Sequence, residues 1–124
     1  MTFRPAVPIL RSFDEAKTKE FYVGFLGFAV DFEHRFEPDM PLYMGMSRGE
    51  CRIHLSEHFG DAAPGARIRI EVDDVKGLCE ALGRKAYRNA RPGWQDQEWG
   101  CTEMTIHDPS GNRLTFWTAL AAGR

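Results

Sequence analysis

Residues 67–83, RIRIEVDDVKGLCEALG, change their hydrophobic period half-way along the segment. The apolar residues of 67–72 alternate with charged ones, which is typical of a half-buried strand. An aspartate then stands where a helix would begin, and either Asp73 or Asp74 can cap it. The apolar residues that follow have the spacing of one helix face: Val75, Leu78, Cys79 and Leu82. The segment therefore predicts a strand followed by a capped helix.

The same strand and helix pattern occurs about 60 residues earlier. Residues 7–11 are predicted to form a short strand, and Pro8 places it near a sheet edge. Ser12 and Glu15 have the spacing of a capping box, in which each side chain bonds a backbone N–H at a helix start. Gly27 is expected to end this helix. The expected buried face consists of Thr18, Phe21, Tyr22 and Phe25.

Three further strands are expected after each helix. Their predicted positions are 28–36, 41–47 and 51–56 in the first half and 86–91, 98–107 and 113–118 in the second. A linker rich in glycine and proline, residues 57–65, separates the halves. The sequence thus predicts one domain made of two βαβββ modules, at about residues 4–60 and 64–120. The expected class is α+β, with a curved mixed sheet and the helices on its outer side.

Composition excludes several broad classes of protein. The 124 residues carry a net charge of only −2, so no nucleic-acid partner is expected. No segment has the apolar length of a signal peptide or a membrane span. The three cysteines are widely spaced and suggest reduced thiols. We expect a cytoplasmic protein without a membrane partner.

Strand alternation predicts a ligand groove on the side away from the helices. The helix-facing set in the last two strands is Met104, Ile106, Leu114 and Phe116. The opposite set, with its counterparts on other strands, is Trp99, Cys101, Glu103, Thr105, His107, Arg113, Thr115, Trp117, Arg52, His54, Ser56, Arg67, Arg69 and Glu71. An ordinary solvated face is the alternative for the arginines. Two tryptophans on one face instead favour cover by a ligand or by a partner subunit.

Several motifs together resemble the vicinal-oxygen-chelate superfamily, which has the glyoxalase and bleomycin-resistance fold. They cover nearly the whole chain and are closest to the bleomycin-binding branch. The motifs are Val7-Pro8-Ile9-Leu10, Glu20-Phe21-Tyr22 with Leu26-Gly27-Phe28, and Trp99-Gly100 followed by His107-Asp108-Pro109-Ser110-Gly111-Asn112.

The resemblance implies four metal-ligand positions in the enzymes of the superfamily, and here they fall on Val7, His54, Arg67 and Thr115. Only His54 could bind a divalent metal, and Arg67 would place a fixed cation in the site. A second set, Glu103, His107 and His54, is disfavoured because residues four apart on a strand are about 13 Å apart. We therefore expect no metal and no cofactor.

The drug-binding branch implies a homodimer with exchanged N-terminal strands and with grooves between the subunits. Residues 31–39 match its aromatic and acidic segment. The resemblance gives stacking roles to Phe32, Phe36 and Trp99, and charged roles to Asp31, Glu33 and Glu103. The implied ligand is a glycopeptide antibiotic of the bleomycin type. The alternative for residues 31–39 is an edge strand whose charges prevent aggregation.

Three functions therefore remain open. The first is non-catalytic sequestration of the drug, with no catalytic residue and with His54, Arg67 and Trp117 completing the expected site. The second is a metal-dependent lyase or dioxygenase of the same fold. The third is a metal-free binder of another, anionic metabolite, anchored by Arg52, Arg67 and Arg69.

Overall fold

The computed structural model describes residues 1–120, which form two successive βαβββ modules. The first contains β1 (Ile9–Arg11), α1 (Glu15–Lys19), the π-helix η1 (Glu20–Phe25), β2 (Ala29–His34), β3 (Tyr43–Arg48) and β4 (Cys51–Ser56). The second contains β5 (Arg67–Glu71), α2 (Val75–Arg84), β6 (Trp94–Gln97), β7 (Cys101–His107) and β8 (Arg113–Ala119). The predicted α+β class and the repeated order of elements are confirmed.

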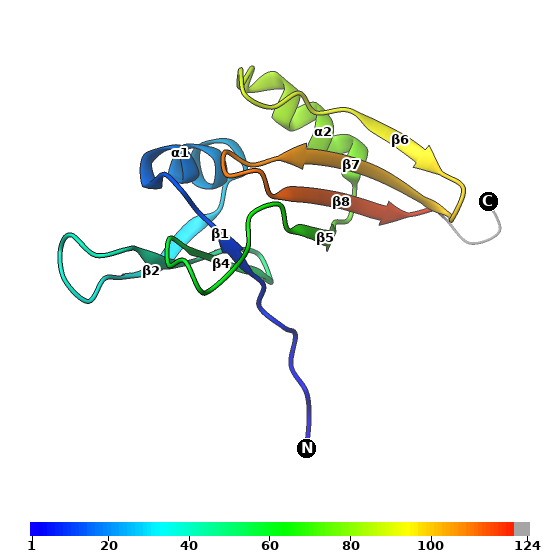
Figure 1. Ribbon diagram of the computed structural model, residues 1–124. Coiled ribbons are helices and arrows are strands. Elements are labelled where there is room, and N and C mark those ends of the chain that lie inside the picture. Colours follow the sequence, from blue (N-terminus) through cyan, green and yellow to red (C-terminus); the bar gives the residue numbers. More distant parts are fainter. Residues whose placement is uncertain (121–124) are drawn as a thin grey trace.

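Each module folds into its own four-stranded mixed sheet. The strand orders are β1-β4-β3-β2 and β5-β8-β7-β6, and in each sheet the first and last strands of the module pair in parallel. In Figure 1, α1 lies above the first sheet and α2 lies above β8 and β5 of the second, while the segment before β1 extends away below them. We call the face of each sheet that is turned away from the helices its open face.

The first helix begins at a different residue from the one predicted. Asp14, not Ser12, caps it, because the Asp14 carboxylate accepts the Lys17 N–H at 2.8 Å. The Ser12 hydroxyl is instead buried and bonds that of Thr18 at 2.9 Å. Both aspartate caps, Asp14 and the predicted Asp74, accept the N–H three residues on.

The strand predicted at 86–91 is wrong, since these residues form turns and irregular backbone. Ala86 has φ of +51°, which is incompatible with an extended chain, and Tyr87 packs its ring 4.8 Å from that of Phe25. The strand lies later, at β6. Its sequence WQDQ is polar and mostly exposed, so hydrophobic alternation gave no signal for it.

The core joins the two modules. The predicted buried face of the first helix, which includes Phe21 and Phe25, packs into one hydrophobic cluster with residues of both modules. Tyr22 is fully buried, and its hydroxyl donates to Asp108 Oδ2 at 2.7 Å. Asn112 Nδ2 donates to the Arg11 carbonyl at 2.8 Å. The turn between β7 and β8 therefore fastens the second module to the first.

Candidate functional site

Three rings form an aromatic cluster on the open face of the first sheet. Phe32 lies with its ring centroid 5.2 Å from His54, and Tyr43 lies 5.3 Å from His54. The Tyr43 hydroxyl is 2.7 Å from His54 Nδ1, which fixes the imidazole ring. Burial, followed by the charge of Asp61, raises the pKa of Tyr43, so this phenol stays protonated at neutral pH. Phe32 is 43% exposed and offers its ring to a ligand.

A glycine makes room for the Phe32 ring. Gly45 is the cross-strand partner of both Phe32 and His54, so it lies between them on the open face. A Cβ atom at Gly45 would overlap Cε1 of Phe32. The missing side chain therefore lets the phenyl ring lie against the sheet.

A buried carboxylate organises the open face of the second sheet. Glu103 is 5% exposed, and its Oε2 accepts from Arg69 at 2.8 Å, from Trp99 Nε1 at 2.9 Å and from Cys101 Sγ at 3.0 Å. We call these four residues the Glu103 cluster. The Arg69 guanidinium, helped by the other donors and opposed by burial, lowers the pKa of Glu103 from 4.5 to about 2. The cluster therefore holds a fixed anion whose charge Arg69 balances.

The two tryptophans of this face differ in their surroundings. Trp117 is half-buried, is the cross-strand partner of Glu103, and carries the Arg69 guanidinium 5.5 Å from its ring. Trp99 is 66% exposed although its indole N–H is bonded to Glu103. The hydrogen bond orients the Trp99 ring without covering it, so this large apolar surface is open to a ligand.

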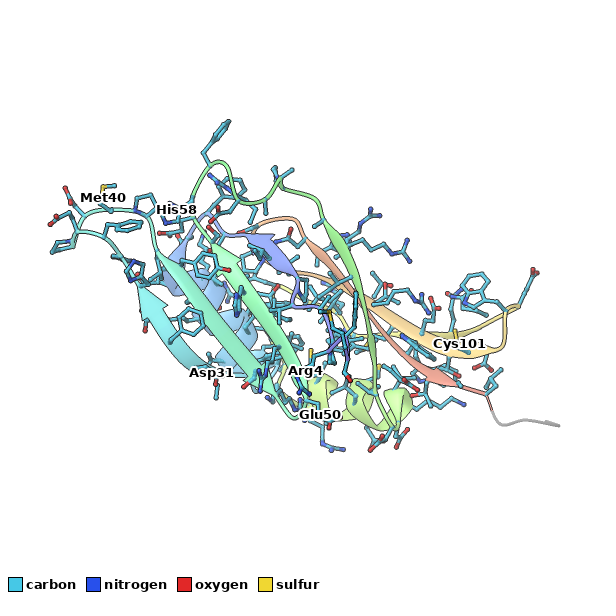
Figure 2. All side chains as sticks on the ribbon, turned by 90° about the horizontal axis from the view of Figure 1, so that it is seen from below. Arg4, Asp31, Met40, Glu50, His58 and Cys101 are labelled. Carbon is cyan, nitrogen blue, oxygen red and sulfur yellow. The ribbon has the colours of Figure 1, made fainter. Side chains whose placement is uncertain are left out.

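The structure separates the residues of the acidic and aromatic segment. Asp31 stays on the open face and accepts the Ser47 hydroxyl at 3.0 Å. Glu33 is opposite the buried Met44 and forms an ion pair with Lys19 of α1 at 3.2 Å, so it faces the helix side. Phe36, 74% exposed, lies in the β2–β3 loop, beyond the end of β2. Figure 2, from below, shows Asp31 and Cys101 on different sheets.

The positions implied for metal ligands do not fit a metal. Strand pairing puts Ile9 beside His54 and Arg69 beside Thr115, rather than Val7 and Arg67. Isoleucine and arginine offer no lone pair to a cation, and Arg69 already binds Glu103. The second proposed set of ligands is Glu103, His107 and His54, and the same ion pair with Arg69 occupies the Glu103 carboxylate. Among residues 1–120, no three histidine, cysteine or acidic side chains are grouped to hold a metal ion.

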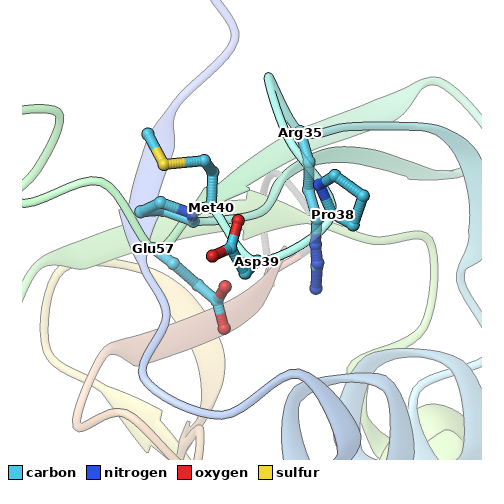
Figure 3. Close-up of a pocket in the computed structure, with 6 residues that line it drawn as sticks. Arg35, Pro38, Asp39, Met40 and Glu57 are labelled. Atoms are coloured by element: carbon cyan, nitrogen blue, oxygen red, sulfur yellow. The ribbon is translucent and has the colours of Figure 1, made fainter.

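Cavities are also lined by other parts of the described chain. One of about 340 Å³ follows the β2–β3 loop, and its lining includes Arg35, Asp39 and Glu57 (Figure 3). Another, of about 660 Å³, lies where the linker meets β1 and is lined by Arg11, Phe13, Phe59, Gly60, Asp61, Ala62, Ala63 and Pro64. A third, also about 660 Å³, lies between the modules beside α2.

Sequence reasoning missed Tyr43 and Gly45, and it treated Arg69 only as a possible anchor. Alternation along strand 51–56 identified His54 on the open face, but the expected strand 41–47 was not sorted by face. A tyrosine and a glycine two residues apart on that strand were the available signal.

Comparison with known proteins gives a family match over almost the whole chain. A family model described as Glyoxalase superfamily protein matches residues 1–122. No curated protein matches the chain. No helix of residues 1–120 is both long and apolar enough to cross a bilayer.

Solved structures of antibiotic-binding proteins are also similar to nearly the whole chain. A bleomycin-binding protein from bleomycin-producing Streptomyces verticillus, complexed with copper(II)-bleomycin, is 31% identical, with a TM-score of 0.73 over 98% of this chain and 99% of its own. A bleomycin resistance determinant encoded on the transposon Tn5 is 25% identical, with a TM-score of 0.71 over 94% and 98%. TnmS3, an antibiotic binding protein from Streptomyces sp. CB03234, is 21% identical with a TM-score of 0.76 over 96% and 98%, which shows a shared fold alone.

Proposed function

The chain belongs to the glyoxalase superfamily, and we propose that within it this protein sequesters a bleomycin-type antibiotic without catalysis. The observation that carries the proposal is the exposed Phe32 ring, held on Gly45 beside Tyr43 and His54. Flat heteroaromatic rings stack on such a surface. The 31% identity with a bleomycin-binding protein supports the same chemistry.

The proposal includes a homodimer with the ligand between two copies. Phe32 lies on β2 of the first sheet, and Trp99 lies in the turn before β7 and bonds Glu103 of the second sheet; both rings are exposed. A second copy that placed its open face opposite would enclose a ligand between the two kinds of aromatic surface and remove them from water. The thiols of Cys51, Cys79 and Cys101 are free, which fits the reducing cytoplasm that we propose as its location.

Calorimetric titration of dialysed, metal-analysed protein with copper-bleomycin tests the proposal. We expect saturation near one drug per chain, with no metal bound to the protein beforehand. A titration that releases or absorbs no heat would contradict bleomycin as the ligand. A stoichiometric protein-bound metal would instead favour the enzyme alternative of the superfamily.

Replacing Trp99 with alanine should abolish most of the fluorescence change that copper-bleomycin induces, because its exposed ring is expected to stack on the drug. The matched control is Trp94→Ala. Trp94 is 45% exposed, but it pairs with the buried Met104 and contacts Lys76, so it belongs to the helix side. Equal losses in the two variants would contradict the role of Trp99.

Replacing Gly45 with alanine should weaken drug binding by about tenfold, which corresponds to about 1.4 kcal/mol. The added methyl group must push the Phe32 ring off the sheet, whereas the fold needs only a side-chain shift. Gly83→Ala, in α2, is the control, because no described residue beyond its chain neighbours and the adjoining helix backbone would lie within 4 Å of the new Cβ. Unchanged affinity in Gly45→Ala, measured by the same titration, would mean that the ring position is irrelevant.

A further inference from the structure

Three positively charged or protonatable side chains lie in a row across the second sheet. Arg67 of β5 is the cross-strand partner of Arg113 of β8, which in turn is the partner of His107 of β7. Their neighbours Ile68, Leu114 and Ile106 point to the core, so all three side chains extend from the open face. Neighbouring strands are about 4.8 Å apart, so one small group can contact adjacent members. We call Arg67, Arg113 and His107 the cationic row.

No carboxylate neutralises the row within the part of the chain that the structure describes. The ion pairs among these residues involve other basic side chains, including Arg69, which binds Glu103. Like charges placed directly opposite each other destabilise a sheet. Protection of a sheet edge explains basic residues on β5, but not on β8 and β7, which are interior strands.

The surroundings of the row suit an anion attached to an aromatic group. His107 and Arg113 flank the β7–β8 turn, and Ser110 in that turn accepts the Phe13 N–H at 3.0 Å. Phe13 and Arg11 line the 660 Å³ cavity at this end of the sheets. Arg11 Nη1 is a buried nitrogen that finds no hydrogen-bond partner among the described residues. The acidic residue of the same cavity, Asp61, accepts the Ser56 hydroxyl at 2.6 Å.

The rest of the open face of the second sheet sets the distance between the cationic row and the two tryptophans. The next positions on the open face, two residues along each strand, are Arg69, Thr115 and Thr105, and the two threonine hydroxyls bond each other at 2.8 Å. Beyond them lie Trp117 and Glu103. Trp117 is four positions along β8 from Arg113, or about 13 Å away. A ligand can therefore place an anion at the row and rings on the indoles.

We propose that the cationic row binds an anionic group, a sulfonate, carboxylate or phosphate, on the ligand of this groove. Arginine is suited to such oxyanions because its donors form paired, charge-assisted hydrogen bonds. This inference rests on the proposed non-catalytic binding function of the groove, and it adds an anionic group to the features of a ligand that the groove would recognise.

Two matched probes test the site: anthracene-2-sulfonate and its neutral analogue anthracene-2-sulfonamide, titrated by fluorescence and calorimetry at low salt. The rings are identical, so their difference isolates the charge. We expect the sulfonate to bind about tenfold more tightly, an advantage that falls as salt is added. Equal affinities for the wild-type protein would overturn the proposal.

The variant is Arg67→Gln with Arg113→Gln, both exposed and both without an ion pair to any of residues 1–120. The control is Arg84→Gln with Arg88→Gln, which removes the same charge from exposed positions outside the open faces. Only the first pair should erase the advantage of the sulfonate. Equal losses in both would show general attraction and overturn the site.

The copper-bleomycin titration separates this inference from the proposed function. Saturation by the drug without any preference for the sulfonate would leave sequestration standing and overturn the anion site. A sulfonate preference that requires Arg67 and Arg113, without binding of copper-bleomycin, would support the site and remove bleomycin as the ligand.

Discussion

Replacing Asp108 with alanine should lower the free energy of unfolding by at least about 3 kcal/mol. The Asp108 carboxylate accepts four hydrogen bonds: from Tyr22 Oη, from the backbone N–H groups of Ser110 and Asn112, and from Asn112 Nδ2. Tyr22 and Asn112 are fully buried. The substitution leaves buried donors without acceptors, and each such donor costs about 1–3 kcal/mol. Urea unfolding, followed by circular dichroism, measures the loss.

Two further variants separate the contact between modules from the turn itself. Tyr22→Phe removes one donor and leaves the other three bonds of Asp108, so we expect a loss of about 1 kcal/mol. Burial, with the charge of Asp108 second, raises the pKa of Tyr22 well above its usual value. The phenol therefore donates this bond throughout the neutral range. Asp73→Ala, on the exposed surface, is the control for removing a carboxylate. A loss in Asp108→Ala no larger than in this control would contradict the fastening role of the turn.

Local patterns predicted the elements that meet at this contact, but not the contact. The helical spacing placed Tyr22 on a buried face, and the Asp-Pro-Ser-Gly-Asn segment matched a family motif. The hydrogen bond between Tyr22 and Asp108 joins residues 86 positions apart. Hydrophobic periodicity describes one element at a time and carries no information on which elements meet.

The same limit explains the revised role of Glu103. Alternation correctly placed Glu103 and Arg69 on one face, but it could not give the register of β5 against β7 across β8. That register brings the two charges to 2.8 Å. A carboxylate to which the resemblance gives a charged role toward the ligand is instead neutralised within the protein. Glu33 shows a related limit. The register of β2 shifts between Val30 and Phe32, and after this shift the Glu33 side chain faces α1 rather than the groove.

The two open faces therefore differ in chemistry. The first offers aromatic rings, Phe32 and Tyr43 with His54, while the second combines the exposed Trp99 indole with the cationic row. The free charge that remains on the second face is positive, because Arg69 cancels the charge of Glu103. The second face is therefore the one on which the proposed anion site lies, whereas both faces offer rings on which a ligand can stack.

Replacing Glu103 with glutamine should destabilise the protein by about 2 kcal/mol at neutral pH, because a charge-assisted bond to Arg69 is lost. Since Arg69 is 43% exposed, solvent screens part of this attraction, and a smaller loss than for Asp108→Ala is expected. Glu98→Gln, on the exposed loop before β7, is the control and should leave stability unchanged.

The loss of unfolding free energy in Glu103→Gln should become smaller as the pH falls. The folded protein lowers the pKa of Glu103 from 4.5 to about 2, so the ionised carboxylate adds stability above pH 4.5 that is lost as the pH falls toward 2. The glutamine variant has no such titration. The difference in unfolding free energy between the two proteins should therefore shrink between pH 4.5 and pH 2, while other carboxylates cancel in the comparison. Urea titrations at several pH values measure this difference, and a gap that stays constant down to pH 2 would contradict the ion pair with Arg69. Trp99 reports on the same carboxylate, because its indole N–H donates to Glu103. A change of Trp99 fluorescence in the pH range in which the stability difference disappears would show that protonation of Glu103 also releases the indole.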